Sequence, residues 1–357
     1  MDHKEIANET LVSYEELFEI GAKSLEMVGV SREDAEVTVE VLLRADLRGV
    51  DTHGIQRLLM YIPRIKKGLM NPKPQIEVHS LAPAVKVVSG DNGLGPVVAT
   101  RGMKEAIGLG KEFGISFVGA RDSHHFGAAA PYALMACREK MIGIVGTNAF
   151  PSMAPWGGLR NLLGNNPLAI GVPCEGNPPF ILDIAMSVSS RGRMREMAEK
   201  GEKMPEGWAV DAQGRPTTDP LEGLKGLVLP MGLHKGYGLA LAIDILSGVL
   251  TGAGFSSGVK SLVQQWEEPQ HIGHFLIVID PTRFMPWEIF SDRMKQFCDS
   301  MRTVPSIDPG RPILIPGEPE ARTEEKRQKN GIPIQRGDLD ILKGLAQGNY
   351  NYKVPRF

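Results

Sequence analysis

The stretch ISFVGARDSHHFGAAAPYALMACREKMIGIV, residues 115–145, contains the pattern that decides the fold. Two short apolar runs, 115–119 and 142–145, have the composition of buried strands. The segment between them predicts a loop and then a helix over 128–140. A strand followed by a helix and a second strand is typical of α/β proteins, so we expect this fold class.

The flanking sequence extends the same pattern. Further apolar runs at 180–184 and 275–279 predict two more strands. The N-terminal part is predicted to be helical, because Ser13 and Ser31 each precede an acidic residue three positions later, as in helix N-caps. The most apolar run, 238–250, is too short to span a bilayer and favours a buried helix.

The composition excludes several classes of protein. The chain has 357 residues, a net charge of -2 and 23% charged residues, without the basic excess of a nucleic-acid-binding protein. The three cysteines, Cys137, Cys174 and Cys298, are too few and too far apart for a disulfide framework. Because the N-terminus is polar and acidic, it resembles neither a signal peptide nor a transit peptide, and we expect a cytoplasmic protein without membrane or nucleic-acid partners.

The usual dinucleotide fingerprint is missing. Gly93 and Gly95 begin a GxGxxG pattern, but Val98 occupies the third glycine position. The similar run at 108–113 ends in Phe113 and also lies outside a strand–turn–helix unit. A dehydrogenase with this sequence therefore needs a cofactor site of another kind.

The first cluster with catalytic potential is RGVDTHGIQR, residues 48–57. Arginine can hold a carboxylate with two hydrogen bonds, and a histidine can exchange a proton with a neighbouring hydroxyl or carbonyl group. Arg48, Arg57, Thr52 and His53 therefore have the parts for acid–base chemistry on a small anion. A helix-capping turn with surface arginines explains the same residues.

The second cluster is DSHHFG, residues 122–127. Its two histidines predict either a metal site or a catalytic imidazole. No further ligands lie at a suitable spacing, so we expect no bound metal. The pair His271 and His274 directly precedes a predicted strand and is expected to be structural.

Three glycine-containing turns are weaker candidates: 164–167, 229–238 and 316–320. The second contains His234 and Lys235 before an apolar helix, and a helix N-terminus with a lysine suits a phosphate group. Each turn is equally well explained as an ordinary loop or helix cap.

Taken together, the motifs resemble the type 2 malate/L-lactate dehydrogenase family. The matching stretches are ADLRGVDTHGIQRL, DSHHFGAA, GTNAFPSMAPWGG, GNNPLAIGVP, GWAVDAQGRPTTDP, LPMGLHKGYGLAL and IPGEPEAR, in the family's order. The resemblance implies a non-Rossmann α/β fold with a helical N-terminal region and a mixed-sheet domain that binds NAD(P). It also implies a homodimer and hydride transfer at C2 of a small 2-hydroxy acid or 2-oxo acid, such as malate, lactate or sulfolactate.

The resemblance also assigns roles to residues. It makes His53 the leading proton carrier with Thr52 as its hydroxyl partner, and His125 a rival. It implies substrate contacts for Arg48, Arg57, Asn165, Arg191 and Gly192. It implies cofactor contacts for His125, Phe126, Gly127, Asp183, His234, Lys235, Pro316, Gly317 and Glu318.

The expected division is a discontinuous helical unit for substrate binding and dimerisation, 1–115 with 305–357, and a cofactor unit, 116–304. Four departures from the family pattern leave the substrate and the choice of NAD or NADP open, with NAD favoured: Thr52, the pair Ala149 and Phe150, the arginines at 190–193, and Leu233. The alternatives are a reductase of cyclic imino acids, a metal-dependent hydrolase or lyase, and a non-catalytic protein that retains the fold.

Overall fold

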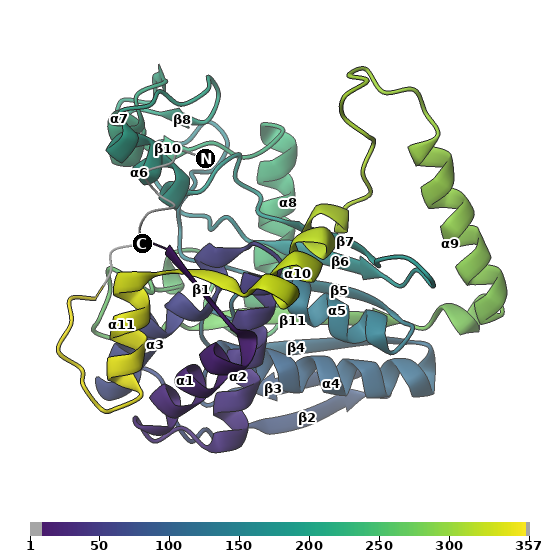
Figure 1. Cartoon of the computed structure of the whole chain (residues 1–357), viewed down its shortest axis with the longest axis horizontal. Coiled ribbons are helices and arrows are strands. Elements are labelled where there is room, and N and C mark those ends of the chain that lie inside the picture. Colours follow the sequence, from purple (N-terminus) through teal and green to yellow (C-terminus); the bar gives the residue numbers. More distant parts are fainter. Residues whose placement is uncertain (1–8, 355–357) are drawn as a thin grey trace.

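The computed structural model describes residues 9–354. Its largest element is a seven-stranded sheet in which only β3 and β4 run parallel (Figure 1). The strand order is β2 (Glu77–Ala82), β3 (Val85–Ser89), β4 (Ile115–Ser123), β11 (Ile272–Ile279), β5 (Ile142–Thr147), β6 (Leu168–Val172) and β7 (Phe180–Ile184). The α/β class and the mixed sheet are therefore confirmed.

Helices cover both faces of this sheet. On one face, α4 (Gly95–Phe113) and α5 (Ala130–Arg138) pack their small and branched side chains against Val118, Val145 and Leu276. On the other face, α8 (His234–Asp244) continues into a π-helical turn, Ile245–Val249, and packs against Phe275. The sheet is thus a buried central layer.

A helical layer is built from both ends of the described chain. It contains α1 (Tyr14–Glu26), α2 (Arg32–Leu47), α3 (Leu58–Lys66), α10 (Glu318–Asn330) and α11 (Arg336–Leu345). Strand β1 (Glu9–Val12) pairs with β12 (Ile332–Gln335), and one apolar core includes side chains from both segments. The predicted helix starts are confirmed, because the hydroxyls of Ser13 and Ser31 accept the backbone N–H groups of Glu16 and Asp34 at 3.1 Å.

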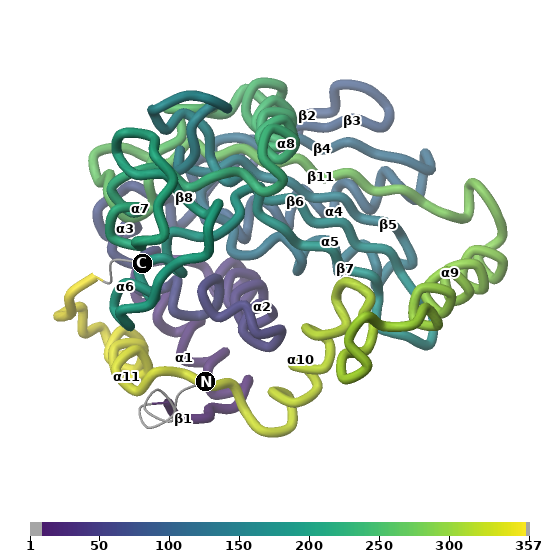
Figure 2. The backbone as a smooth tube through the Cα atoms, turned by 90° about the horizontal axis from the view of Figure 1, so that it is seen from above, coloured from purple at the N-terminus to yellow at the C-terminus, as the bar shows by residue number. Residues whose placement is uncertain are grey.

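Two smaller parts extend from this body. A lobe with a methionine-rich core contains α6 (Arg191–Lys200), α7 (Pro220–Lys225), β8 (Ala209–Val210), β9 (Pro216–Thr217) and β10 (Leu227–Val228). Helix α9 (Trp287–Arg302) projects from the opposite side, where both views show it apart from the other helices (Figures 1 and 2). Of the side chains on α9, only Cys298 is buried.

One expectation differs from the structure. The apolar run 238–250 forms a helix as predicted, but the prediction that it is buried is wrong: Leu239, Ile245 and Leu250 are 47%, 53% and 60% exposed. The helix has apolar side chains on two faces, and only the face with Ala240 and Ile243 packs against the sheet. The sheet begins at Glu77, since β2 pairs with β3 and β3 pairs with β4. The functional division of the chain stays a prediction.

Helix α4 and helix α9 were not anticipated from the sequence. Helix α4 contains four glycines, and glycine lowers the helical propensity of a segment. Its helical state therefore depends on packing against the sheet. Within residues 9–354, no helix is long and apolar enough to cross a membrane.

Candidate active site

The two predicted histidines meet where the helical layer contacts the end of β4. His53 ends the first of two 3₁₀ turns, Asp51–His53 and Ile55–Arg57, which connect α2 to α3. His125 follows the end of β4. Their rings are stacked, with centroids 5.6 Å apart and an interplanar angle of 23°. Residues 72 positions apart in the sequence thus form one site.

The turn that carries His53 is held by a buried carboxylate. Asp46, in the last turn of α2, is 1% exposed, and its Oδ2 atom accepts the backbone N–H of Ile55 at 2.7 Å. Gly54 lies so close that a Cβ atom on it would stand 1.7 Å from Asp46 Oδ1. Arg327 of α10 bonds to the backbone carbonyl of Asp46 and to the carboxylate of Asp51. The turn is therefore fixed from both sides.

His53 has a hydroxyl partner, as predicted. Its Nδ1 atom lies 3.0 Å from Thr52 Oγ1, and Arg57 Nε donates to the backbone carbonyl of Thr52 at 2.6 Å. Burial, together with the charge of Arg57, lowers the pKa of His53 to about 3. Because this imidazole is neutral at physiological pH, it can accept a proton.

His125 is held by a residue that sequence reasoning missed. The hydroxyl of Tyr61, a fully buried residue of α3, lies 2.7 Å from His125 Nδ1. Burial is the main cause that lowers the pKa of His125 well below its usual value, and the charges of Arg57 and His53 act in the same direction. The helical spacing of Arg57 and Tyr61, four residues apart, was the signal that could have identified the tyrosine.

Arg48 lies at a second position. Its side chain is buried, forms an ion pair with Glu324 of α10 at 3.1 Å, and donates to the carbonyl of Gly317 at 3.5 Å. It lines a cavity of about 560 Å³ among α2, α5 and α10. No described contact joins it to the two histidines, so its role as a substrate ligand stays a prediction.

The expected cofactor residues gather in two groups. In the first, Asp183 on β7 accepts the backbone N–H of Ala130 at 2.7 Å, and the carbonyl of Pro316 accepts the N–H of Ile181 at 2.9 Å. The side chain is exposed, but loss of hydration from the surrounding protein is the main cause that raises the pKa of Asp183 to about 6. Gly317 has a φ of +96°, and a Cβ atom there would lie 2.9 Å from the Ile181 nitrogen.

The second group is the start of α8. His234 and Lys235 are exposed at its N-terminus, and the indole of Trp156 lies edge-on to His234 at 6.3 Å. The first N–H groups of a helix attract anions, so this end suits a diphosphate, while the Asp183 carboxylate suits ribose hydroxyls. These residues therefore fit a nicotinamide dinucleotide.

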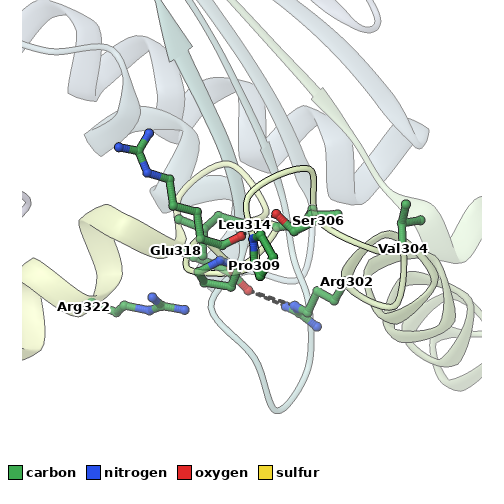
Figure 3. Close-up of a pocket in the computed structure, with 10 residues that line it drawn as sticks. Arg302, Val304, Ser306, Pro309, Leu314, Glu318 and Arg322 are labelled. Atoms are coloured by element: carbon green, nitrogen blue, oxygen red, sulfur yellow. Dashed lines mark hydrogen bonds and ion pairs between the residues drawn. The ribbon is translucent and has the colours of Figure 1, made fainter.

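Glu318, the last residue of the expected cofactor turn, is engaged with the protein. Its carboxylate binds the guanidinium of Arg302 (Figure 3). It also accepts the backbone N–H of Ile315 at 3.0 Å. Burial acts to raise the pKa of Glu318, but these partners outweigh it and the pKa lies below its usual value. A cavity of about 430 Å³ lies beside this ion pair. In this structure Glu318 fastens α10 to the end of α9.

The remaining predicted residues lie elsewhere. Phe126 is 1% exposed and stacks between Tyr132 and His274, so only its backbone could meet a ligand. The carbonyl of Asn165 accepts the N–H of Met186 at 2.7 Å. Arg191 donates to the carbonyl of Leu224. These contacts leave the binding roles of Phe126, Asn165, Arg191 and Gly192 untested.

The other histidines of the two pairs have different surroundings. Both nitrogens of His274 have partners at 2.8 Å, Thr147 and Ser123, which fits the expected structural role. His124 is fully buried. Across residues 9–354, no three His, Cys, Asp or Glu side chains are grouped so that they could hold a metal ion.

The chain is similar in sequence and structure to several known dehydrogenases. The family model for malate/L-lactate dehydrogenase matches residues 12–343. The malate dehydrogenase of Pyrococcus horikoshii is 41% identical over 94% of both chains. The malate/(S)-sulfolactate dehydrogenase of Methanothermus fervidus is 40% identical over 94% of this chain and 97% of its own. The structure of sulfolactate dehydrogenase from Methanocaldococcus jannaschii superposes with a TM-score of 0.90 at 40% identity, covering 95% of this chain and 97% of that one.

Proposed function

This chain belongs to the malate/L-lactate dehydrogenase family, and we propose that it interconverts a small 2-hydroxy acid and the corresponding 2-oxo acid with NAD(P). The observation that carries the proposal is the stacked pair of imidazoles of His53 and His125 beside Arg57. The chain is about as similar to a malate dehydrogenase as to a sulfolactate dehydrogenase. Acid–base groups next to a guanidinium are what the redox chemistry of a hydroxyl next to a carboxylate requires.

In the oxidation direction, Arg57 binds the substrate carboxylate and His53 removes the proton of the C2 hydroxyl. Burial keeps the His53 ring neutral, so that a ring nitrogen has a lone pair available for that proton. Bound NAD(P) supplies the hydride acceptor, or the hydride donor in the reverse direction. Arg48, Asn165, Arg191 and Gly192 are the proposed contacts to the rest of the substrate.

For the cofactor we propose NAD. Asp183, His234 and Lys235, together with the turn Pro316–Glu318, would hold it, and Gly127 and the backbone of Phe126 would border it. A carboxylate accepts hydrogen bonds from ribose hydroxyls and repels a 2′-phosphate, so Asp183 favours NAD over NADP if it faces the adenosine ribose.

We also propose a homodimer in the cytoplasm. The exposed apolar side chains of α8 and of the turn that follows it, among them Leu239, Ile245 and Leu250, form a face of the kind that protein partners cover. Analytical ultracentrifugation at two protein concentrations tests the assembly. A Leu250→Glu variant should shift it toward the monomer.

The function is tested by following absorbance at 340 nm with NADH and NADPH separately. Each is combined with oxaloacetate, pyruvate, 3-sulfopyruvate and a cyclic imino acid. Turnover with one or more 2-oxo acids supports the proposal and identifies the cofactor. Turnover with the imino acid alone would replace it with a reductase of C=N bonds, and binding of neither cofactor would refute it.

A further inference from the structure

Tyr61 and the backbone of Gly127 occupy the same ring nitrogen of His125. The Tyr61 hydroxyl lies 2.7 Å from Nδ1, and the N–H of Gly127 donates to this atom at 3.3 Å. The rings of Tyr61 and His125 meet edge to face at 6.0 Å. Gly127 has a φ of +81°, a conformation that glycine adopts without strain.

These contacts decide where the proton of His125 is. A backbone N–H can only donate, so Nδ1 must be the acceptor, and the neutral ring carries its hydrogen on Nε2. Burial raises the pKa of Tyr61, which keeps its hydroxyl protonated and able to donate as well. Its second acceptor within reach, the carbonyl of His125 at 3.1 Å, belongs to the same residue.

His53 is bound differently. Its Nδ1 partner is the hydroxyl of Thr52, which can donate or accept. When Nδ1 of His53 donates to Thr52, Nε2 is free to take up a proton, and the protonated ring keeps the same hydrogen bond. The protonated form of His125, in contrast, would direct an N–H at the N–H of Gly127.

We propose that the two histidines divide the work: His53 carries the proton, while His125 stays neutral and donates an Nε2–H hydrogen bond to the C2 oxygen, with Tyr61 as the positioning residue. Among the described residues, no hydrogen-bond partner occupies Nε2 of either ring. In oxidation, the O–H bond breaks and its proton passes to Nε2 of His53, the C2–H pair leaves as hydride for the oxidised nicotinamide that NAD(P) would supply, and C2=O forms. The N–H of His125 does not break.

This division rests on the proposed function and extends it. A neutral imidazole is a suitable donor here because it stabilises negative charge on oxygen without losing its own proton. The charged and titratable groups around His125 are Arg57, His53, His274 and Tyr61. Arg57 disfavours a positive charge on either ring, so the hydrogen bonds at Nδ1 are what distinguish His125 from His53.

The first test needs no turnover. Nitrogen-15 NMR of histidine-labelled protein, with the His125 signals assigned by a His125→Gln variant, reports which ring nitrogen carries hydrogen. We expect the Nε2–H form from pH 6 to 8 in the wild type. Tyr61→Phe keeps only the longer hydrogen bond from Gly127, at 3.3 Å, so a larger fraction of the Nδ1–H form is expected there. Tyr352→Phe is the matched control, because this hydroxyl donates to the Leu59 carbonyl at 3.0 Å on the same helix, α3. A protonated or Nδ1–H ring in the wild type would refute the proposal even if the enzyme is a dehydrogenase.

The second test uses kinetics on the substrate identified by the panel. Glutamine can donate a hydrogen bond but cannot carry a proton at neutral pH. We therefore expect His125→Gln to lower kcat about 10²-fold and to leave its pH dependence unchanged, whereas His53→Gln should abolish activity. Tyr61→Phe should lower kcat about 10-fold without changing the Kd of NADH. Equal loss in both glutamine variants, or an altered pH profile in His125→Gln, would refute this division of roles.

Discussion

Replacing Gly54 with alanine should damage both the stability and the activity of the protein. The alanine Cβ atom would lie 1.7 Å from Oδ1 and 2.2 Å from Cγ of Asp46, far closer than atoms can approach. The backbone of Gly54 itself, with φ -87° and ψ -158°, is accessible to alanine. The cost therefore comes from the clash alone.

The clash can be relieved in two ways, and each has a cost. If Asp46 rotates away, the N–H of Ile55 loses its acceptor, which costs about 1–3 kcal/mol in a buried site. If the turn moves instead, overpacking costs about 1–3 kcal/mol and His53 shifts. Either route should lower the free energy of unfolding by about 1–3 kcal/mol. A displaced turn should also lower kcat by about 10²-fold, since a displacement near 1 Å is enough for that loss.

Urea unfolding at a fixed protein concentration, with steady-state kinetics, measures both effects. Gly108→Ala is the control, because Gly108 is exposed on α4 with no atom near its Cβ position, and alanine should stabilise by about 0.5–1 kcal/mol. The decisive variant combines Gly54→Ala with Asp46→Ala. If Gly54→Ala costs as much there as in the wild type, the contact with Asp46 is not the reason.

Three further predictions concern charged groups. Arg57→Met should raise the KM of the 2-oxo acid about 10²-fold with the Kd of NADH unchanged, and an unchanged KM would remove Arg57 from the substrate site. Glu324→Gln should lower the free energy of unfolding by about 2–4 kcal/mol, because it removes the carboxylate that pairs with the buried charge of Arg48. Glu325→Gln is the control: it breaks the exposed ion pair with Lys329 and should change the free energy of unfolding by about 0.5 kcal/mol or less. With the pKa of Asp183 near 6, NADH binding should weaken as pH falls through 6, because a protonated carboxyl group is a poorer hydrogen-bond acceptor. Fluorescence titration measures the Kd of NADH at each pH, and in Asp183→Asn this Kd should not change with pH.

The same raised pKa has a consequence for stability, with a definite sign. A carboxyl group whose pKa is higher in the folded state than in the unfolded state binds its proton more tightly when folded. Asp183 therefore stabilises the fold below pH 3.8, and this contribution is lost as the pH rises to about 6. Asp183→Asn should remove that part of the pH dependence of unfolding.

Much of the fold could be predicted because its signals are local. The strands at 142–147 and 180–184 and the helix caps at Ser13 and Ser31 depend on neighbouring residues in the chain. Helix α4 could not be predicted, since its glycines oppose a helix and only its contact with the sheet compensates.

The sequence by itself determined the α/β class, the family and the identity of the two candidate histidines, because short-range periodicity and ordered motifs carry that information. Only the tertiary structure decided that the two rings stack, that Tyr61 binds one of them and that Arg48 pairs with Glu324. These contacts join residues 64 to 276 positions apart. Such contacts depend on how helices pack on the sheet, which the local pattern of polar and apolar residues does not specify.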